Sequence, residues 1–424
     1  MDFNTLLLRL GLDPQNFVNR LNEPIKTGTG FIYEVDQKVT ITHCPYCRHD
    51  KLYVKGYFYT EKNCNSSNHL TDTLNIRRVR LKCLTCSKSF TPPLKGIEPY
   101  TKISNQTLQL IHNEFTQMLT FSAIAKKYDI STARVLQLFD EHVKFVPRRP
   151  LPEVLCIDEI RFSKDVDHAY ICILYDFHNR EIVDIIRNRR MPYLREYFNE
   201  INPIERAKVK IVISDMYDAY SSITRAYFKS AIHIVDTFHV IRLLTNTVNV
   251  LRTRTMNLHA DKQSPLYNFM KKNWKLFLGR AYHVPNKFYT YKKTGQMFHY
   301  DELMRRSLAL NIDLYLAYNT LQDLYRYEQK FTYDEALRFV ERIRDNLLDS
   351  TNELLKATGR SFHKWRFEMA NAFSKTQNNI RYTNAIAESI NNKIKTITKL
   401  AYGYRDFERF RKRALLILTY GKTS

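Results

Sequence analysis

Two apolar stretches of the sequence each lead directly into an aspartate. Val154–Ile157 is followed by Asp158 and Glu159, and Lys210–Ser214 is followed by Asp215. Their short length and β-branched residues are typical of buried strands. A carboxylate at the end of a buried strand is costly unless a cation neutralises it. A divalent metal ion is therefore the expected partner if a third acid joins these two aspartates.

Glu388 is the candidate third acid, in a stretch that reads TNAIAESINNKIKTITK from Thr383. At about 100° per residue, a helix over this stretch has an isoleucine-rich face and an opposite polar face. The polar face carries Asn384, Glu388, Asn391, Asn392 and Lys395. Taken alone, Glu388 would suit the exposed side of an amphipathic helix. The neighbouring amides and the two aspartates favour a site in which three oxygen donors bind Mg²⁺ or Mn²⁺.

A further acid, Asp236, follows the strand candidate 231–235, and His239 comes three residues later. One interpretation is a histidine at the start of a helix that Asp236 caps. The other is an accessory role beside the three acids, which is also possible for Asn384, Asn391 and Lys395.

Four of the seven cysteines form two Cys-x-x-Cys pairs, Cys44 with Cys47 and Cys83 with Cys86. Two such pairs supply four thiolates for a tetrahedral zinc site, which would be structural because no ligand position stays open. The alternating segments 52–57 and 75–81 between the pairs predict the strands of a zinc ribbon. The alternative is a set of buried free cysteines. Weaker candidate ligands are Cys64, His43, His49 and His69.

The net charge of +23 is the main compositional signal. Nucleic acid is the usual partner of so basic a protein, although a basic surface can also simply maintain solubility. Arg77, Arg78 and Arg80 would give the predicted zinc ribbon a basic edge for phosphates. The sequence contains no apolar run long enough for a membrane span. The paired cysteines indicate a reducing environment, so we expect a cytoplasmic, nucleoid-associated protein.

A second DNA-binding element is predicted after the proline-containing linker that follows the zinc ribbon. Residues 104–146 read as three helices, the third beginning at Ser131 or Thr132, both of which favour helix N-termini. This order is typical of a helix-turn-helix, although a plain helical hairpin would look similar. In a helix-turn-helix, Thr132, Arg134 and Gln137 would face bases or phosphates.

The central part of the chain predicts a mixed α/β domain. Strand candidates cover 154–162, 169–177, 181–187, 209–214 and 231–235, with a helix over 193–200. This order is the skeleton of a ribonuclease-H-like sheet. An all-helical insertion or an independent helical domain would follow. Within it, the pairs Lys271-Lys272 and Lys292-Lys293 could contact a DNA backbone, although each would also suit a solvated helix face.

The sequence therefore predicts a multidomain α/β protein. An N-terminal segment (1–40), with a strand over 38–41, precedes a zinc ribbon (41–92) and a helix-turn-helix domain (100–147). A ribonuclease-H-like catalytic core would comprise 150–245 and 376–424, interrupted by an all-helical insertion over 246–375.

Together these motifs resemble the ISL3 family of DDE transposases of bacterial insertion sequences. The resemblance covers nearly the whole chain, and the order of the motifs makes it specific. It rests on the four cysteines, Cys156–Glu159, Ser214–Met216 with Tyr220, Asp236 with Phe238–Val240, Asn384–Lys395, and Gly403-Tyr404 with Phe407.

The resemblance implies that Asp158, Asp215 and Glu388 are catalytic acids that bind two Mg²⁺ or Mn²⁺ ions. It also implies terminal inverted repeats and target DNA as double-stranded DNA partners, and a homodimer or larger homo-oligomer on DNA. Such an enzyme would cleave at the transposon ends and join the 3′-hydroxyl to target DNA. Two other classes fit parts of the sequence. A non-catalytic zinc-ribbon and helix-turn-helix regulator would not need three acids, and a structure-selective nuclease would cleave without joining.

Overall fold

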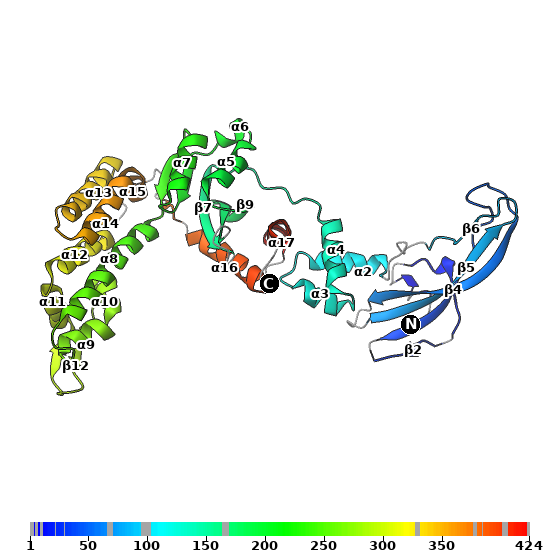
Figure 1. Ribbon diagram of the computed structural model, residues 1–424, viewed down its shortest axis with the longest axis horizontal. Helices are drawn as coiled ribbons and strands as arrows, with labels where there is room; N and C mark the ends of the chain where they lie inside the picture. Colours follow the sequence, from blue (N-terminus) through cyan, green and yellow to red (C-terminus); the bar gives the residue numbers. More distant parts are fainter. Residues whose placement is uncertain are drawn as a thin grey trace. The chain divides into compact units, whose positions relative to one another are not determined.

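The structure is a computed structural model, and the chain divides into two compact units (Figure 1). The N-terminal unit comprises residues 1–147 and 396–424, and the central unit comprises 148–395. None of the helices in the described ranges has the length and hydrophobicity that a membrane span requires. The structure describes residues 4, 7, 8, 12–21, 23–28, 30–65, 71–94, 103–162, 169–326, 331–375, 380–383, 385–400 and 406–421.

The N-terminal unit contains a six-stranded sheet with one long antiparallel hairpin. The hairpin pairs β4 (Leu52–Asn65) with β5 (Thr71–Cys83) and has a bulge between Val54 and Gly56. On its other side, β5 pairs in parallel with β3 (Phe31–Gln37). The remaining strands are β1 (Phe17–Asn19), β2 (Ile25–Lys26) and β6 (Ser89–Phe90).

The strand predicted over 38–41 is wrong, because the strand in this region is β3, which ends at Gln37. Val35 in β3 is fully buried and pairs with Ile76 of β5. Residues 38–40 are all exposed, so this segment has no buried face that would hold it to the sheet.

Three helices follow where three were predicted: α2 (Asn105–Glu114), α3 (Phe121–Lys127) and α4 (Thr132–His142). Each begins after a hydroxyl side chain that accepts a hydrogen bond from a first-turn amide. The capping residues are Ser104, Thr120 and Ser131. Phe115, Phe121 and Phe139 meet edge to face and form the core between these helices.

A fourth helix, α17 (Phe407–Tyr420), also belongs to the N-terminal unit. Its Arg413 is buried and donates hydrogen bonds to backbone carbonyls at the end of α2 and in the following turn, those of Glu114, Gln117 and Leu119. Arg409 of α17 also pairs with Asp140 of α4 at 2.6 Å. The structure therefore groups residues 396–424 with these helices, whereas the sequence predicts that 376–424 belong to the ribonuclease-H-like core.

The central unit is built on a five-stranded sheet in the order β11-β10-β7-β8-β9. The strands β7, β10 and β11 are parallel. β8 pairs antiparallel with β7, and β9 pairs antiparallel with β8. Their bounds lie close to the five predicted strands: β7 (Val154–Arg161), β8 (Tyr170–Asp176), β9 (Glu181–Ile186), β10 (Ile211–Ser214) and β11 (Ile232–Val235).

Two helices pack on this sheet through a continuous apolar core. Leu194 and Phe198 of α5 (Met191–Asn199) and Ile223 of α7 (Asp218–Tyr227) are fully buried against strand residues such as Leu155 and Val212. A short helix, α6 (Pro203–Arg206), connects α5 to β10.

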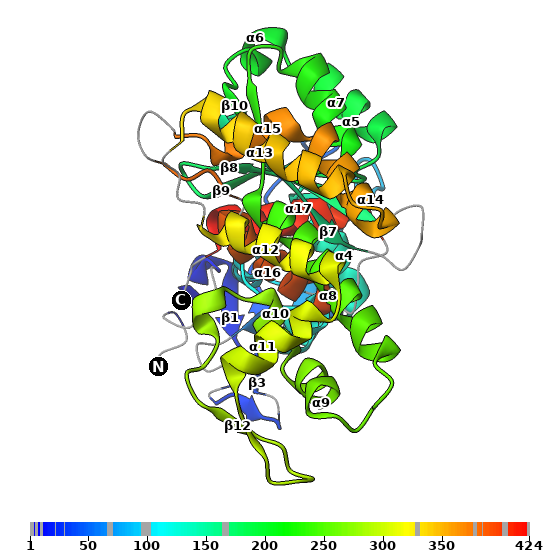
Figure 2. The same cartoon turned by 90° about the vertical axis from the view of Figure 1, so that its left-hand side faces the viewer.

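The insertion begins with α8 (Thr237–Leu258), which runs through the predicted boundary at residue 246 as one continuous helix. Seven further helices follow: α9 (Pro265–Lys272), α10 (Trp274–Leu278), α11 (Tyr300–Ala309), α12 (Ile312–Arg326), α13 (Tyr333–Leu348), α14 (Glu353–Lys364) and α15 (Arg366–Phe373). The prediction of an all-helical insertion is wrong in one place, where β12 (Phe288–Thr290) and β13 (Met297–His299) form a hairpin. Each of these strands has only three residues, which is too short for an alternation of apolar and polar side chains to be recognised in the sequence. In both views, α9 and the hairpin lie at the end of the insertion far from the sheet (Figures 1 and 2).

Candidate active site

The register of the three parallel strands places three acids in one row. Ser214 pairs with Ile157 on one side and with Val235 on the other. The next residue after Ile157, Ser214 and Val235 is an aspartate in each case. Asp158, Asp215 and Asp236 therefore lie at adjacent positions across the three strands. Asp158 is still within β7, which continues to Arg161, whereas β10 and β11 end before their aspartates.

Asp158, on β7, lies at one end of this row, and Asp215 is in the middle. The Asp158 carboxylate accepts hydrogen bonds from the Glu159 amide at 2.7 Å and from Asn391 Nδ2 at 2.6 Å. Burial, followed by the negative charge of Asp215, raises the pKa of Asp158 to about 6. A raised pKa means that the charged carboxylate is unfavourable at this position. A cation that binds in place of the proton therefore stabilises the carboxylate.

Asp215 and Asp236 form a second cluster with His239, in which one ligand atom from each lies within 4.8 Å of the others. His239 Nε2 is 2.9 Å from Asp215 Oδ1. Burial lowers the pKa of His239, but the Asp215 carboxylate outweighs it, so the pKa is raised overall. Asp236 is buried and caps α8 by accepting a hydrogen bond from the Phe238 amide.

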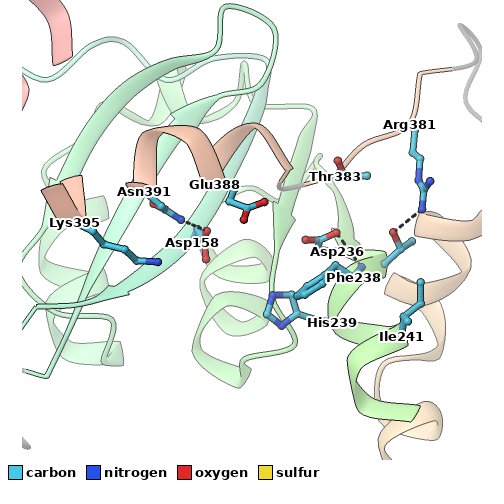
Figure 3. Close-up of a pocket in the computed structure, with 11 residues that line it drawn as sticks. Asp158, Asp236, Phe238, His239, Ile241, Arg381, Thr383, Glu388, Asn391 and Lys395 are labelled. Atoms are coloured by element: carbon cyan, nitrogen blue, oxygen red, sulfur yellow. Dashed lines mark hydrogen bonds between the residues drawn. The ribbon is translucent and has the colours of Figure 1, made fainter. Parts of the chain in front are cut away.

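Glu388 lies on α16 (Ala385–Leu400) and is exposed. It lines a pocket of about 550 Å³ together with Asp158, Asp236 and His239 (Figure 3). Asp215 does not line this pocket, but it contacts His239, which does. The pocket wall also includes Arg381, Thr383, Asn391 and Lys395. The predicted accessory residue Asn384 lies outside the described residues.

α16 packs in the expected way, with Ile390, Ile394 and Ile397 buried. Asn391 is buried too, although the sequence placed it on the polar face. The hydroxyl of Tyr175, on β8, donates a short hydrogen bond to Asn391 Oδ1, which turns the Nδ2 group toward Asp158. Burial raises the pKa of Tyr175 well above its ordinary value, so the hydroxyl keeps the proton that it donates. Sequence reasoning missed Tyr175, whose only signal is a tyrosine in an otherwise apolar strand.

Glu159 faces the opposite side of β7 from Asp158. Arg189 pairs with it, and the Arg189 guanidinium stacks on Tyr170 and Tyr217, at 4.2 and 4.7 Å from the ring centroids. The Glu159 carboxylate is therefore engaged in a structural ion pair with Arg189.

The four cysteines of the N-terminal unit converge as predicted, with all Sγ atoms within 4.8 Å of one another. The Cys44–Cys86 and Cys47–Cys83 Sγ distances are 3.7 and 3.5 Å. Four thiolates at about 2.3 Å from a zinc ion would lie about 3.8 Å apart, so the cluster fits zinc. The backbone amides of Cys86 and Thr85 lower the pKa of Cys83 to about 6, which favours the thiolate. The rival ligands His43 and His49 are not in this cluster, and His69 and the Cys64 side chain lie outside the described residues.

The predicted DNA-binding residues differ in their exposure and in the contacts that they already make within the protein. Arg77 makes a paired hydrogen bond to Asp36, and Arg78 donates to the Pro92 carbonyl at 2.6 Å. Arg80 and Thr132 are exposed. On α4, Gln137 donates to Glu141 at 2.8 Å, and Arg134 lies 3.7 Å from the same carboxylate.

Residues 155–414, more than half of the chain, match the sequence model of the ISL3-type DDE transposases, described as transposase. The chain belongs to this family and is a transposase, an enzyme class that cuts and joins DNA and uses divalent metal ions. It is also 23% identical over 342 residues to the transposase for insertion sequence element IS1001 of Bordetella parapertussis, covering 80% of this chain and 79% of that protein.

Proposed function

We propose that the central unit is a ribonuclease-H-like core in which Asp158, Asp215 and Glu388 catalyse cleavage at the transposon ends and strand transfer. One observation carries this proposal. Asp158 and Glu388, which are 230 positions apart in sequence, line one pocket, and Asp215 contacts His239 of the pocket wall. The strand order β9-β8-β7-β10-β11, with three antiparallel strands followed by two parallel ones, supports the fold assignment.

The three acids would hold two Mg²⁺ ions, because hard oxygen donors without thiolates suit this metal. When bound, the ions would activate the attacking oxygen and stabilise the leaving 3′ oxygen of the scissile phosphate. The chain's own residues prepare the site. Asn391 orients Asp158, and His239 holds Asp215 while its positive form balances the clustered negative charge. Lys395 lines the pocket and would contact a DNA phosphate there.

The N-terminal unit would bind the terminal inverted repeats. Its four cysteines would form a structural zinc ribbon, and α3 and α4 would form a helix-turn-helix with α4 as recognition helix. Arg80 and Thr132 are the best placed of the predicted contact residues, since both are exposed, whereas the exposed Gln137 already donates to Glu141. Cleavage at two transposon ends would require a homodimer or larger assembly.

The test is donor-strand cleavage by the full-length protein carrying Asp158→Asn, Asp215→Asn or Glu388→Gln. Each substitution keeps the side-chain shape and removes the charge, so cleavage should fall by about 100-fold or more. Asp218→Asn is the matched control, because Asp218 is an exposed acid of the same unit that pairs with Lys364. Cleavage at the wild-type rate in any of the three variants would remove that residue from the site.

A further inference from the structure

The far end of the insertion carries an unusual concentration of positive charge. Residues 261–300, here called the basic tip, contain eight lysines and arginines and one acid, Asp261. All eight cationic side chains are exposed: Lys262, Lys271, Lys272, Lys275, Arg280, Lys287, Lys292 and Lys293. None of the eight forms an ion pair with any residue in the part of the chain that the structure describes.

Two other helices of the insertion, α11 and α14, differ from the basic tip because they carry acids beside their cations. On α11, Arg305 pairs with Asp301 at 3.0 Å and Arg306 with Glu302 at 2.6 Å. On α14, Lys356 and Arg360 both lie within 4 Å of Glu353. The cations of these two helices that are named here each lie within 4 Å of an acid on the same helix, whereas the cations of the basic tip have no such partner among the described residues.

The basic tip is also a packed platform. Phe269 and Phe277 are fully buried, and the Phe269 ring meets Tyr289 and Tyr300 edge to face. The pair Lys292-Lys293 sits in the hairpin turn, which is closed by a hydrogen bond from the Tyr291 amide to the Gln296 carbonyl at 2.8 Å. Three aromatic side chains, Trp274, Tyr282 and Phe288, are exposed among the cations. A fixed platform of exposed cations is typical of a surface that binds the phosphate backbone of DNA.

One helix connects this platform to the pocket. The first turn of α8 supplies Thr237, Phe238 and His239 to the pocket wall, and the basic tip begins just after its last residue, Leu258 (Figures 1 and 2). Its 22 residues span about 33 Å. That length corresponds to roughly ten base pairs of duplex DNA, at about 3.4 Å per pair.

We propose that the basic tip binds the phosphate backbone of the donor duplex, about one helical turn from the scissile phosphate in the pocket. This inference rests on the proposed function, because it takes the pocket as the place of the scissile phosphate. The donor duplex is favoured because it is the DNA that must stay fixed while its phosphate is attacked. A contact one turn away would set the direction in which the duplex leaves the pocket.

The test compares full-length wild-type protein with a variant carrying Lys271→Ala, Lys272→Ala, Lys292→Ala and Lys293→Ala. These side chains are exposed and unpaired with acids, so the fold should be retained. Binding to a duplex that contains the transposon end is measured from about 50 to about 200 mM salt. Each lost phosphate contact should reduce the slope of log K against log salt by about 0.9 and weaken binding roughly 5-fold at about 0.15 M salt.

The matched control carries Arg305→Ala and Arg306→Ala, which remove two exposed cations of the insertion that each pair with an acid of their own, Asp301 and Glu302. Its slope should equal that of the wild type. Hydroxyl-radical footprinting gives the position, and the variant should lose protection about ten base pairs from the cleavage site while it keeps protection elsewhere.

An unchanged slope, or lost protection at another position, would overturn the inference. So would a defect confined to strand transfer into target DNA, since the occupant would then be target DNA. The Asp158→Asn variant separates this inference from the proposed function. The Asp158→Asn variant should bind DNA with the wild-type salt dependence and fail to cleave it. If this variant cleaves normally, the proposed function is refuted, whatever salt dependence the lysine variant shows.

Discussion

At the scale of single residues, the candidate site depends on how the Asp158 carboxylate is held. A carboxylate on a strand can rotate between several orientations, and only some present both oxygens to the pocket. The Tyr175 hydroxyl fixes the Asn391 amide, and the amide donates to Asp158 Oδ2 at 2.6 Å. Together with the hydrogen bond from the Glu159 amide to Oδ1, this chain of two hydrogen bonds fixes the orientation of the carboxylate.

We predict that Asn391→Ala weakens metal binding and cleavage by about 10- to 100-fold, the usual effect of removing a residue that orients a metal ligand. The measurement is the Mn²⁺ concentration at half-maximal cleavage, together with the cleavage rate at saturating Mn²⁺. A positioning role requires the first quantity to rise. Lys393→Ala is the control, because Lys393 is exposed on the same helix. Unchanged metal dependence in Asn391→Ala would leave Asn391 as a packing residue.

The sequence predicts the acids of this site better than it predicts their neighbours. Asp158 and Asp215 follow apolar runs, and Glu388 stands out on an amphipathic helix, so each has a local signal. The contact between Tyr175 and Asn391 joins residues 216 positions apart, and no local pattern reports it. The same limit applies to Arg77, whose pairing with Asp36 comes from the neighbouring strand β3 and removes it from the basic edge that the sequence suggested.

At the scale of elements, α2 and α4 meet at their last turns through two histidines. The rings of His112 and His142 stack with centroids 3.6 Å apart and an interplanar angle of 14°. Burial, followed by the proximity of His142, lowers the pKa of His112 to about 4. Protonation of His112 therefore opposes the packing of these two helices.

This contact predicts a loss of stability in mild acid. His112 takes up its proton near pH 6.5 in the unfolded chain and near pH 4 in the folded one. Between these values the unfolded state binds more protons, so stability falls as pH decreases through this range. His112→Phe keeps an aromatic ring against His142 and removes the titration. Hydrogen exchange of the α2 and α4 amides, corrected for intrinsic rates, should show less loss of protection from about pH 7.5 to about pH 5 in the variant. Equal losses in both proteins would contradict this explanation.

The sequence predicts elements where one period persists over many residues. The five strands of the central sheet and the three helices after Ser104 are present because their apolar residues repeat and their N-caps are hydroxyl residues. The β12–β13 hairpin was missed because its strands are only three residues long. The predicted strand over 38–41 failed because alternation alone cannot show that a face is buried.

At the scale of the whole molecule, the chain leaves the N-terminal unit at residue 147 and returns to it at residue 396. The sequence could not show this return, because a basic amphipathic helix such as α17 has the same pattern whichever unit it joins. Arg413 provides the physical reason. Its guanidinium is buried, donates to three carbonyls around the turn between α2 and α3, and stacks over Phe121 at 5.2 Å.

We therefore predict that residues 1–147 do not form stable α2–α4 helices on their own, whereas residues 1–147 joined to 396–424 by a glycine-serine linker do. Without α17, the three carbonyls lose the Arg413 donor, and the Phe115 and Phe121 rings lose the guanidinium that stacks on them. In the fusion, Arg413→Ala leaves these carbonyls without their donor, which costs about 1–3 kcal/mol for a buried group. Hydrogen exchange should show weak protection of α2–α4 in the short fragment and strong protection in the fusion. Arg413→Ala in the fusion should again weaken the protection of α2–α4, whereas Lys412→Ala, at a half-exposed neighbouring position, should not. Strong protection in residues 1–147 alone would mean that α17 is only attached to a domain that is already stable.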